Sequence, residues 1–166
     1  MKCPECRSPM TSRIGDYTYD EGGLNVRLIG VEWRKCETCV EETVSIPRIE
    51  DLNRVIVRAI VEKPSRLSAA EVKFLRKSLG WSGVDFARQM HADPATVSRW
   101  ENGAQPIGIG ADIMLRLQAI LLSPVEEYPR ERIQERLAEV KDELTPALKL
   151  GARFAGKSWR TEQAAA

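Results

Sequence analysis

Apolar residues recur at helical spacing in three short segments between residues 69 and 103. Each segment starts with a side chain that can accept hydrogen bonds from the free backbone N–H groups of a first helical turn. The start signals are the capping box Ser68 to Glu71, the similar pair Ser82 and Asp85, and Asp93 followed by Pro94. The pattern therefore predicts helices that begin near residues 69, 83 and 94.

The apolar positions of these helices predict one small core. Its expected members are Val72, Leu75, Leu79, Trp81, Phe86, Ala87, Met90, Val97 and Trp100. Gly80 and Gly103 can take the left-handed conformation that ends the first and third helices. Two short helices meeting at a tight turn are typical of a helix-turn-helix, and we expect one over residues 82–103 that places Arg99 in the major groove of DNA.

Other helical patterns flank this region. Residues 47–63 carry Ile49, Leu52, Ile56 and Ile60 on one helical face, and residues 63–65 follow as a linker. A last helix of the helix-turn-helix region covers 111–121. Beyond it, Ile133, Leu137, Val140 and Leu144 form a short seam at spacings of four, three and four. This seam predicts a helix that packs on its own domain or, alternatively, pairs with a second copy.

Alternation of apolar and polar residues is confined to the N-terminal part. Tyr17 and Tyr19 alternate with polar residues, Gly22 and Gly23 form a turn signal, and a β-prone run follows to residue 31. The pattern predicts a small sheet there. Residues from 151 onward hold few apolar anchors and are expected to form a mobile tail.

Composition and charge narrow the function. The 166 residues are 43% hydrophobic and 30% charged, with a net charge of +1. Residues 63–122 hold eight basic and five acidic side chains, so an excess of positive charge lies on the expected DNA reader. No apolar run reaches the roughly 20 residues of a membrane span, and the start lacks a signal-peptide core. We expect a cytoplasmic protein without membrane association.

All four cysteines lie near the N-terminus, as two Cys-x-x-Cys pairs. Cys3, Cys6, Cys36 and Cys39 have the spacing at which two tight turns supply four thiolates to one Zn²⁺. Disulfides, which are rare in the cytosol, and a redox dithiol are the alternatives. Four protein ligands leave no open coordination position, so the pattern predicts one structural zinc. His91, the only histidine, is expected at the surface. The sequence shows no arrangement of catalytic residues, so we do not expect an enzyme.

The segments FLRKSLGWS and TVSRWENG, with Ala87, Pro106 and a last helix, resemble the Xre/Cro-type helix-turn-helix regulators over residues 66–122. The resemblance implies that Arg76 and Glu101 form a buried ion pair with a scaffolding role. It also implies that the solvent-exposed face of the second helix of the helix-turn-helix reads DNA. Arg99 offers the planar donor fork that pairs with guanine, and Ala95 offers only a methyl contact.

Phosphate contacts are expected from side chains around this face. The candidates are Thr96, Ser98, Asn102, Arg88 and Lys77. The alternative for each of these residues is a solvated surface side chain. For Arg88 and Lys77 the two interpretations have equal weight. A homodimer is expected, with a palindromic operator in double-stranded DNA whose half-sites lie about 10 bp apart or a multiple of that.

Both halves together resemble the MqsA/YgiT-type antitoxins. The resemblance rests on the N-terminal CPEC, on LIGVEWRKCETC and on the helix-turn-helix. It implies a zinc domain that binds a partner toxin, a small ribonuclease, and a helix-turn-helix dimer that represses the shared operon. The alternatives are a stand-alone Xre-family regulator and a zinc-ribbon adaptor that binds only protein.

These patterns predict an α+β fold of separate modules. A small zinc-pinned β domain would be followed by an all-α Xre/Cro-type helix-turn-helix domain and a C-terminal helix. The expected boundaries are 1–46 for the zinc domain, 47–65 for the connecting helix and linker, 66–122 for the helix-turn-helix domain, and 123–166 for the helical extension and tail.

Overall fold

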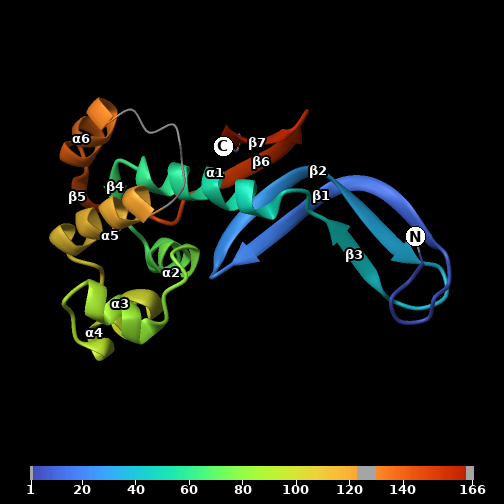
Figure 1. Cartoon of the computed structure of the whole chain (residues 1–166), viewed down its shortest axis with the longest axis horizontal. Helices are drawn as coiled ribbons and strands as arrows, with labels where there is room; N and C mark the ends of the chain where they lie inside the picture. The colour runs from blue at the N-terminus through green and yellow to red at the C-terminus, as the bar shows by residue number, and fades with distance from the viewer. Residues whose placement is uncertain (1, 123–129, 164–166) are drawn as a thin grey trace. The chain divides into compact units, whose positions relative to one another are not determined.

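The computed structural model describes residues 2–122 and 130–163, and the fold is α+β (Figure 1). The described residues form six helices and seven strands. The chain divides into two compact units, each discontinuous in sequence. The first contains residues 1–19, 25–52 and 149–166, and the second contains residues 20–24 and 53–148.

The first unit is built on a mixed five-stranded sheet. Its strands are β1 (Met10–Glu21), β2 (Leu24–Cys36), β3 (Glu42–Ser45), β6 (Leu150–Ala155) and β7 (Ser158–Gln163). The order is β1-β2-β6-β7, and β3 also pairs with β2. β6 runs parallel to β2 with Val26 opposite Leu150, whereas β3 and β7 pair in antiparallel fashion with β2 and β6. Leu24, Val26 and Leu28 of β2 are fully buried and alternate with exposed residues, which gives this part of the sheet one apolar face.

The predicted fold class is wrong in its architecture. The sheet is larger than a small zinc-pinned domain, because two of its strands lie within residues 150–163, and the chain from residue 151 was expected to form a mobile tail. Gly156 has a φ of 65° and begins a two-residue turn between β6 and β7, and Trp159 is 3% exposed. The indole N–H of Trp159 donates to the carbonyl of Pro47 at 2.7 Å. This hairpin is therefore anchored in the first unit.

The second unit holds most of the helices, namely α1 (Ile49–Val61), α2 (Ala69–Ser78), α3 (Gly83–Gln89), α4 (Pro94–Asn102), α5 (Ile109–Leu122) and α6 (Arg130–Ala138). The first four residues of α1 belong to the first unit. Two short strands, β4 (Ser65–Arg66) and β5 (Lys141–Leu144), pair in parallel within the second unit. This unit is therefore not all-α, and the expected C-terminal helical seam ends at residue 138 and continues as a strand.

The predicted starts of α2, α3 and α4 are confirmed. The Ser68 and Ser82 hydroxyls accept from the backbone N–H groups of Glu71 and Asp85, and both capping boxes are complete. Asp93 caps α4. Seven of the nine predicted core residues are buried, and the other two, Leu79 and Trp81, are half-buried. The predicted turn at residues 22–23 is also confirmed, because both glycines have positive φ.

The segment expected as a linker at residues 63–65 has two buried residues, Lys63 and Ser65, and is held within the second unit. The Arg116 guanidinium of α5 is 0% exposed and donates to the carbonyl oxygens of Val61, Lys63 and Ser65, at distances from 2.6 to 2.9 Å. It also pairs with the equally buried Asp112 at 2.6 Å. These bonds hold the chain between α1 and α2 against α5.

A second buried ion pair joins the same segment to α2. The Lys63 ammonium lies 2.8 Å from the Glu71 carboxylate, and their side chains are 3% and 0% exposed. Glu71 also accepts from the backbone N–H of Leu148 at 2.8 Å. One carboxylate therefore completes the cap of α2, neutralises Lys63 and fixes the segment that follows β5.

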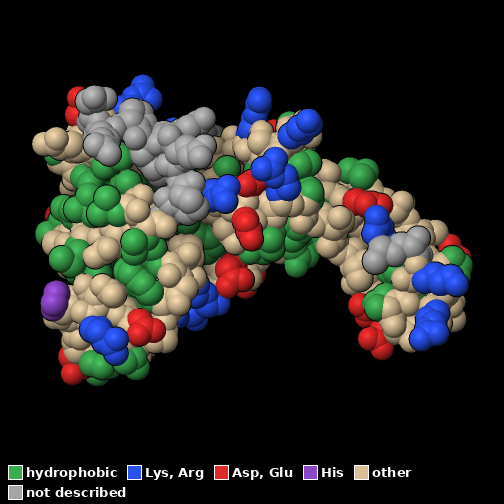
Figure 2. Space-filling model, in the orientation of Figure 1, with side chains coloured by type: hydrophobic (Ala, Val, Ile, Leu, Met, Phe, Trp, Pro, Cys, Tyr) green, Lys and Arg blue, Asp and Glu red, His purple; other side chains and the backbone are tan. Residues whose placement is uncertain are grey.

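The outer side of α5 is apolar. Met114, Leu117, Leu121 and Leu122 are between 39% and 76% exposed. Figure 2 shows hydrophobic side chains gathered around this helix on one face of the unit.

Candidate metal centre and candidate nucleic-acid interface

The four cysteines of the first unit converge on one point. Cys3 and Cys6 lie in the turn before β1, Cys36 is the last residue of β2, and Cys39 follows in the loop that leads to β3. The first turn is closed by a bond from the Arg7 N–H to the Cys3 carbonyl, with Arg7 in the left-handed region at a φ of 62°. The sheet register thus brings two separate turns together.

The geometry of the sulfur atoms fits a tetrahedral ion. All four lie within 4.8 Å of one another, and three of the pairs are 3.4 to 3.6 Å apart. Zinc–sulfur bonds of about 2.3 Å place the sulfurs of a tetrahedral site about 3.8 Å apart. A disulfide needs about 2.05 Å, so these cysteines are free thiols. The four cysteines can therefore hold one metal ion.

The pKa values of two of the thiols are shifted in opposite directions. Hydrogen bonds from the Ser8 side chain and backbone, and then from Cys36, lower the pKa of Cys6 to about 6. The backbone at Glu41 lowers the pKa of Cys39, but hydrogen bonds with Cys36 and the other thiols, together with desolvation, raise it to about 12. Crowded sulfurs typically behave in this way, because each thiolate makes it harder for the next thiol to lose its proton. A bound cation neutralises the negative charge that accumulates on such a cluster.

The protein supplies further donors around the sulfurs. The backbone N–H groups of Thr38 and Cys39 point at the Cys36 sulfur at 3.4 and 3.5 Å. Cys3 and Cys36 are 1% and 2% exposed, whereas Cys6 is exposed. Four thiolates complete a tetrahedron, so the donor set suits a structural ion rather than one that binds substrate.

A second candidate site lies on α3 and α4, in the other unit. The two helices are joined by a turn in which His91 has a φ of 49°. Both pack on a core that contains Phe86, which is fully buried and lies 6.3 Å, centroid to centroid, from the ring of Trp100. Ala87 on α3 is 4% exposed, and this small side chain lets the two helices approach closely.

Arg76 and Glu101, the pair that the family resemblance implies, lie in contact. The Arg76 Nε donates to the Glu101 carboxylate at 2.5 Å, and both side chains are about 15% exposed, so the pair is half-buried. Arg76 also donates to the Trp81 carbonyl at 2.7 Å. The pair joins α2 to α4 and holds the chain that enters α3.

The expected base-reading residues share the outer face of α4. Ala95, Ser98, Arg99 and Asn102 are exposed, and Thr96 is half-buried. Asn102 also accepts a bond from the N–H of Ala104 at 3.0 Å, which closes the helix end. The outer face of α4 thus presents one guanidinium among small side chains.

Arg99 is held by two neighbours. Its Nη2 donates to the Thr96 hydroxyl at 2.7 Å and its Nε to the Gln105 side-chain oxygen at 3.2 Å. The Gln105 N–H in turn donates to the Arg99 carbonyl at 3.2 Å. Sequence reasoning missed Gln105, because it follows the helix and only the loop after Gly103 brings it back.

The two expected phosphate contacts outside α4 differ in their surroundings. Lys77 pairs with Glu21, the last residue of β1, at 2.7 Å. Arg88 is 74% exposed and lies 3.9 Å from Asp85, a loose pair across one turn of α3. Arg88 therefore has the freer cationic group of the two.

No model of a protein family matches the chain, and no curated protein resembles it in sequence. Among the helices of residues 2–122 and 130–163, none combines the length and the apolar character that a membrane crossing requires.

Proposed function

We propose that this chain is a sequence-specific DNA-binding transcriptional repressor and that α4 enters the major groove. The observation that carries the proposal is the outer face of α4, where Arg99 is exposed, braced by Thr96 and Gln105, and surrounded by small side chains. A guanidinium held in this way can give two parallel hydrogen bonds to guanine O6 and N7. The capped, closely packed α3 and α4 supply the rigid frame that such a contact requires.

The test begins by selecting bound duplexes from a random library and comparing affinity for the selected and a scrambled sequence over a range of salt. Arg99→Ala should reduce the discrimination by about 1–3 kcal/mol. Arg88→Ala should weaken both duplexes equally and lower the salt slope by about one. Arg160→Ala, at an exposed arginine of β7, is the matched control and should change neither. Equal affinity of the unaltered chain for both duplexes would refute the proposal.

We further propose that the metal is one structural Zn²⁺ held by Cys3, Cys6, Cys36 and Cys39. The crowded sulfurs and the absence of a disulfide among these cysteines support this assignment. Purified protein should contain one zinc per chain, and a strong chelator should disturb the near-ultraviolet signal of Trp33 on β2, the strand that ends at Cys36. A chain that keeps its sheet without any metal would contradict the assignment.

The family resemblance supports a more specific role, the antitoxin of a type II toxin–antitoxin system. In this proposal the zinc-bearing unit binds a small ribonuclease toxin, and a homodimer of the chain occupies a palindromic operator. Purification from the native operon followed by mass spectrometry should recover a small co-encoded protein in stoichiometric amount. A chain that always purifies alone, beside no small toxin-like reading frame, would favour a stand-alone regulator.

A further inference from the structure

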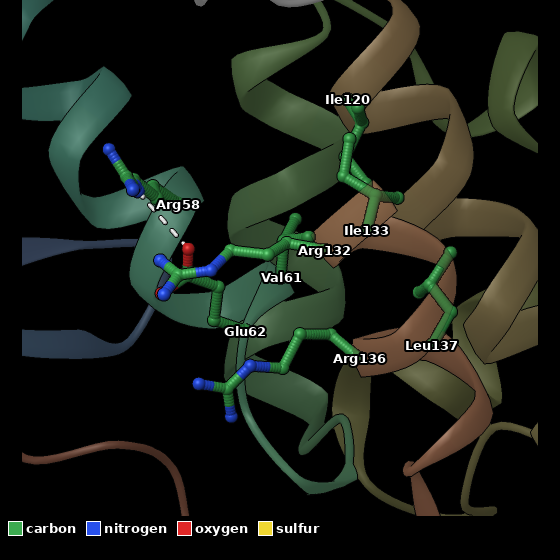
Figure 3. A pocket seen from close by; sticks show the side chains of 8 residues that line it. All are labelled: Arg58, Val61, Glu62, Ile120, Arg132, Ile133, Arg136 and Leu137. Atoms are coloured by element: carbon green, nitrogen blue, oxygen red, sulfur yellow. Dashed lines mark hydrogen bonds and ion pairs between the residues drawn. The ribbon is translucent and has the colours of Figure 1, made fainter. Parts of the chain in front are cut away.

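A small pocket opens between α1, α5 and α6 in the second unit (Figure 3). It has a cavity volume of about 80 Å³. Its lining residues are Arg58, Val61, Glu62, Ile120, Arg132, Ile133, Arg136 and Leu137. None of these residues belongs to the cysteine cluster or to the outer face of α4, so the pocket needs an explanation of its own.

The pocket has an apolar wall supplied by three helices. Val61 ends α1 and is 4% exposed, Ile120 lies on α5, and Ile133 and Leu137 lie one turn apart on α6. The last three are half-buried, so their remaining exposed surface faces water or a ligand. An apolar group placed against them would remove that surface from water, which favours binding.

The opposite side of the pocket is charged. Arg58 and Glu62 form an ion pair at 3.1 Å across one turn of α1. Arg132 and Arg136 are exposed and form no ion pair or hydrogen bond with the described part of the chain. Figure 3 shows both guanidinium groups extending toward the side of the pocket where Glu62 lies, away from Leu137. Three arginines and one glutamate leave this side with an excess of positive charge.

The two α6 arginines also repel each other. They are four residues apart on one helix, so their charges lie on the same face, one turn from each other. An anion between the guanidinium groups would remove that repulsion and accept charge-assisted hydrogen bonds from both. A carboxylate suits the planar donor groups of arginine especially well.

The volume limits the ligand. Pockets for drug-sized molecules measure about 300–1,000 Å³, so this one accommodates only a short apolar chain or one small ring. We propose that the pocket binds a small amphipathic carboxylate, with its apolar end against Val61, Ile120 and Ile133 and its carboxylate on Arg132 and Arg136. This binding does not depend on the chain's recognition of DNA.

Hexanoate is a suitable probe, because it combines a carboxylate with a short apolar chain. Titration of the full chain, followed by calorimetry and by chemical-shift changes in labelled protein, should show saturable binding of one hexanoate per chain. Acetate lacks the apolar chain and therefore the burial of that chain against the three helices. Hexan-1-ol lacks the charge that the two arginines would bind. Each should bind at least about tenfold more weakly than hexanoate.

Variants distinguish binding in the pocket from a general attraction of anions to a positively charged protein. Arg132→Ala combined with Arg136→Ala should weaken hexanoate binding by about tenfold or more. The matched control, Lys149→Ala combined with Arg160→Ala, removes the same charge elsewhere and should leave binding unchanged. All four substituted side chains are exposed, so the variants should keep the far-ultraviolet spectrum of the unaltered chain.

Three outcomes would overturn the proposal. The first is a lack of saturable hexanoate binding, and the second is equal binding of hexan-1-ol. The third is the same loss of affinity in the control variant as in the α6 variant, because it would mean that only net charge attracts the anion.

Discussion

Arg116 is the side chain on which the second unit should depend most. Replacing it by methionine keeps the length and apolar stem but removes the guanidinium. Asp112, 0% exposed, would lose its ionic partner, and three buried carbonyl oxygens between residues 61 and 65 would lose a donor each. Breaking a buried ion pair from one side costs about 3–5 kcal/mol, and each unpaired buried group adds about 1–3 kcal/mol.

These costs do not add in full, because the structure relaxes and water enters, so we expect Arg116→Met to destabilise the unit by at least 3–5 kcal/mol. That is a large share of the roughly 5–15 kcal/mol by which small proteins are stable. Urea unfolding followed by far-ultraviolet circular dichroism measures the loss. Trp81 and Trp100 lie in this unit and make fluorescence a second probe.

Two further variants serve as controls for this measurement. Arg132→Met makes the same replacement at an exposed arginine and should change stability by no more than about 0.5 kcal/mol. Arg116→Met with Asp112→Asn removes both charges and keeps an oxygen that can accept from the buried Leu67 N–H, which donates to Asp112 at 2.6 Å. This double variant should be less destabilised than Arg116→Met alone, because no buried carboxylate is left unpaired. An Arg116→Met variant within about 1 kcal/mol of the unaltered chain would refute the reasoning, since no group in a buried network of this kind is that dispensable.

Three other predictions concern single positions. Gly151→Val should destabilise the sheet by about 1–3 kcal/mol, measured by thermal melting, because an added Cβ would lie 3.1 Å from a β7 carbonyl; an unchanged melting temperature would contradict the tight β6–β7 pairing. Gln105→Ala should release Arg99 and reduce discrimination between selected and scrambled duplexes without changing the salt slope, whereas an altered slope would assign Gln105 to phosphate contact. The Ser82 hydroxyl and backbone N–H lower the pKa of Asp85, so its contribution to stability is present above the unfolded pKa of about 3.9 and is lost as pH falls through the folded pKa. The stability difference between the unaltered chain and Asp85→Asn should therefore shrink in acid, and a constant difference from pH 6 to pH 2 would contradict this.

The elements that sequence analysis predicted correctly are those with local causes. Ser68 and Glu71 satisfy each other's backbone groups within one turn, and Asp93 caps the helix that directly follows it. The turn at residues 22–23 depends on two glycines with positive φ. Such signals are complete within a few residues, so no tertiary contact is needed to interpret them.

The errors concern contacts between distant parts of the chain. β6 pairs in parallel with β2, with Leu150 opposite Val26, and nothing near either residue specifies that partner. The turn at Gly156 has a positive φ, but the segment around it has few apolar residues, so the sequence alone did not predict this hairpin. Trp159 alone supplies much of its anchoring.

In the candidate sites, too, local features were predicted and long-range contacts were not. The cysteine spacing predicted the cluster, because each Cys-x-x-Cys pair lies within one short turn. Gln105 and Arg116 could not be found in this way. Arg116 lies in an apolar helix where it resembles an isolated surface charge, and its role follows from carbonyl groups that only the chain between α1 and β4 brings to it.

The central claim of this account is that the Arg99 guanidinium reads the edge of a guanine. Replacing each guanine of the selected duplex in turn by 7-deazaguanine removes the N7 acceptor and leaves the Watson–Crick pairing intact. The unaltered chain should lose about 1–3 kcal/mol of binding free energy at one guanine in each half-site, and Arg99→Ala should lose nothing further there. If the unaltered chain tolerates every replacement, or if Arg99→Ala loses as much at the same guanine, Arg99 does not read that base.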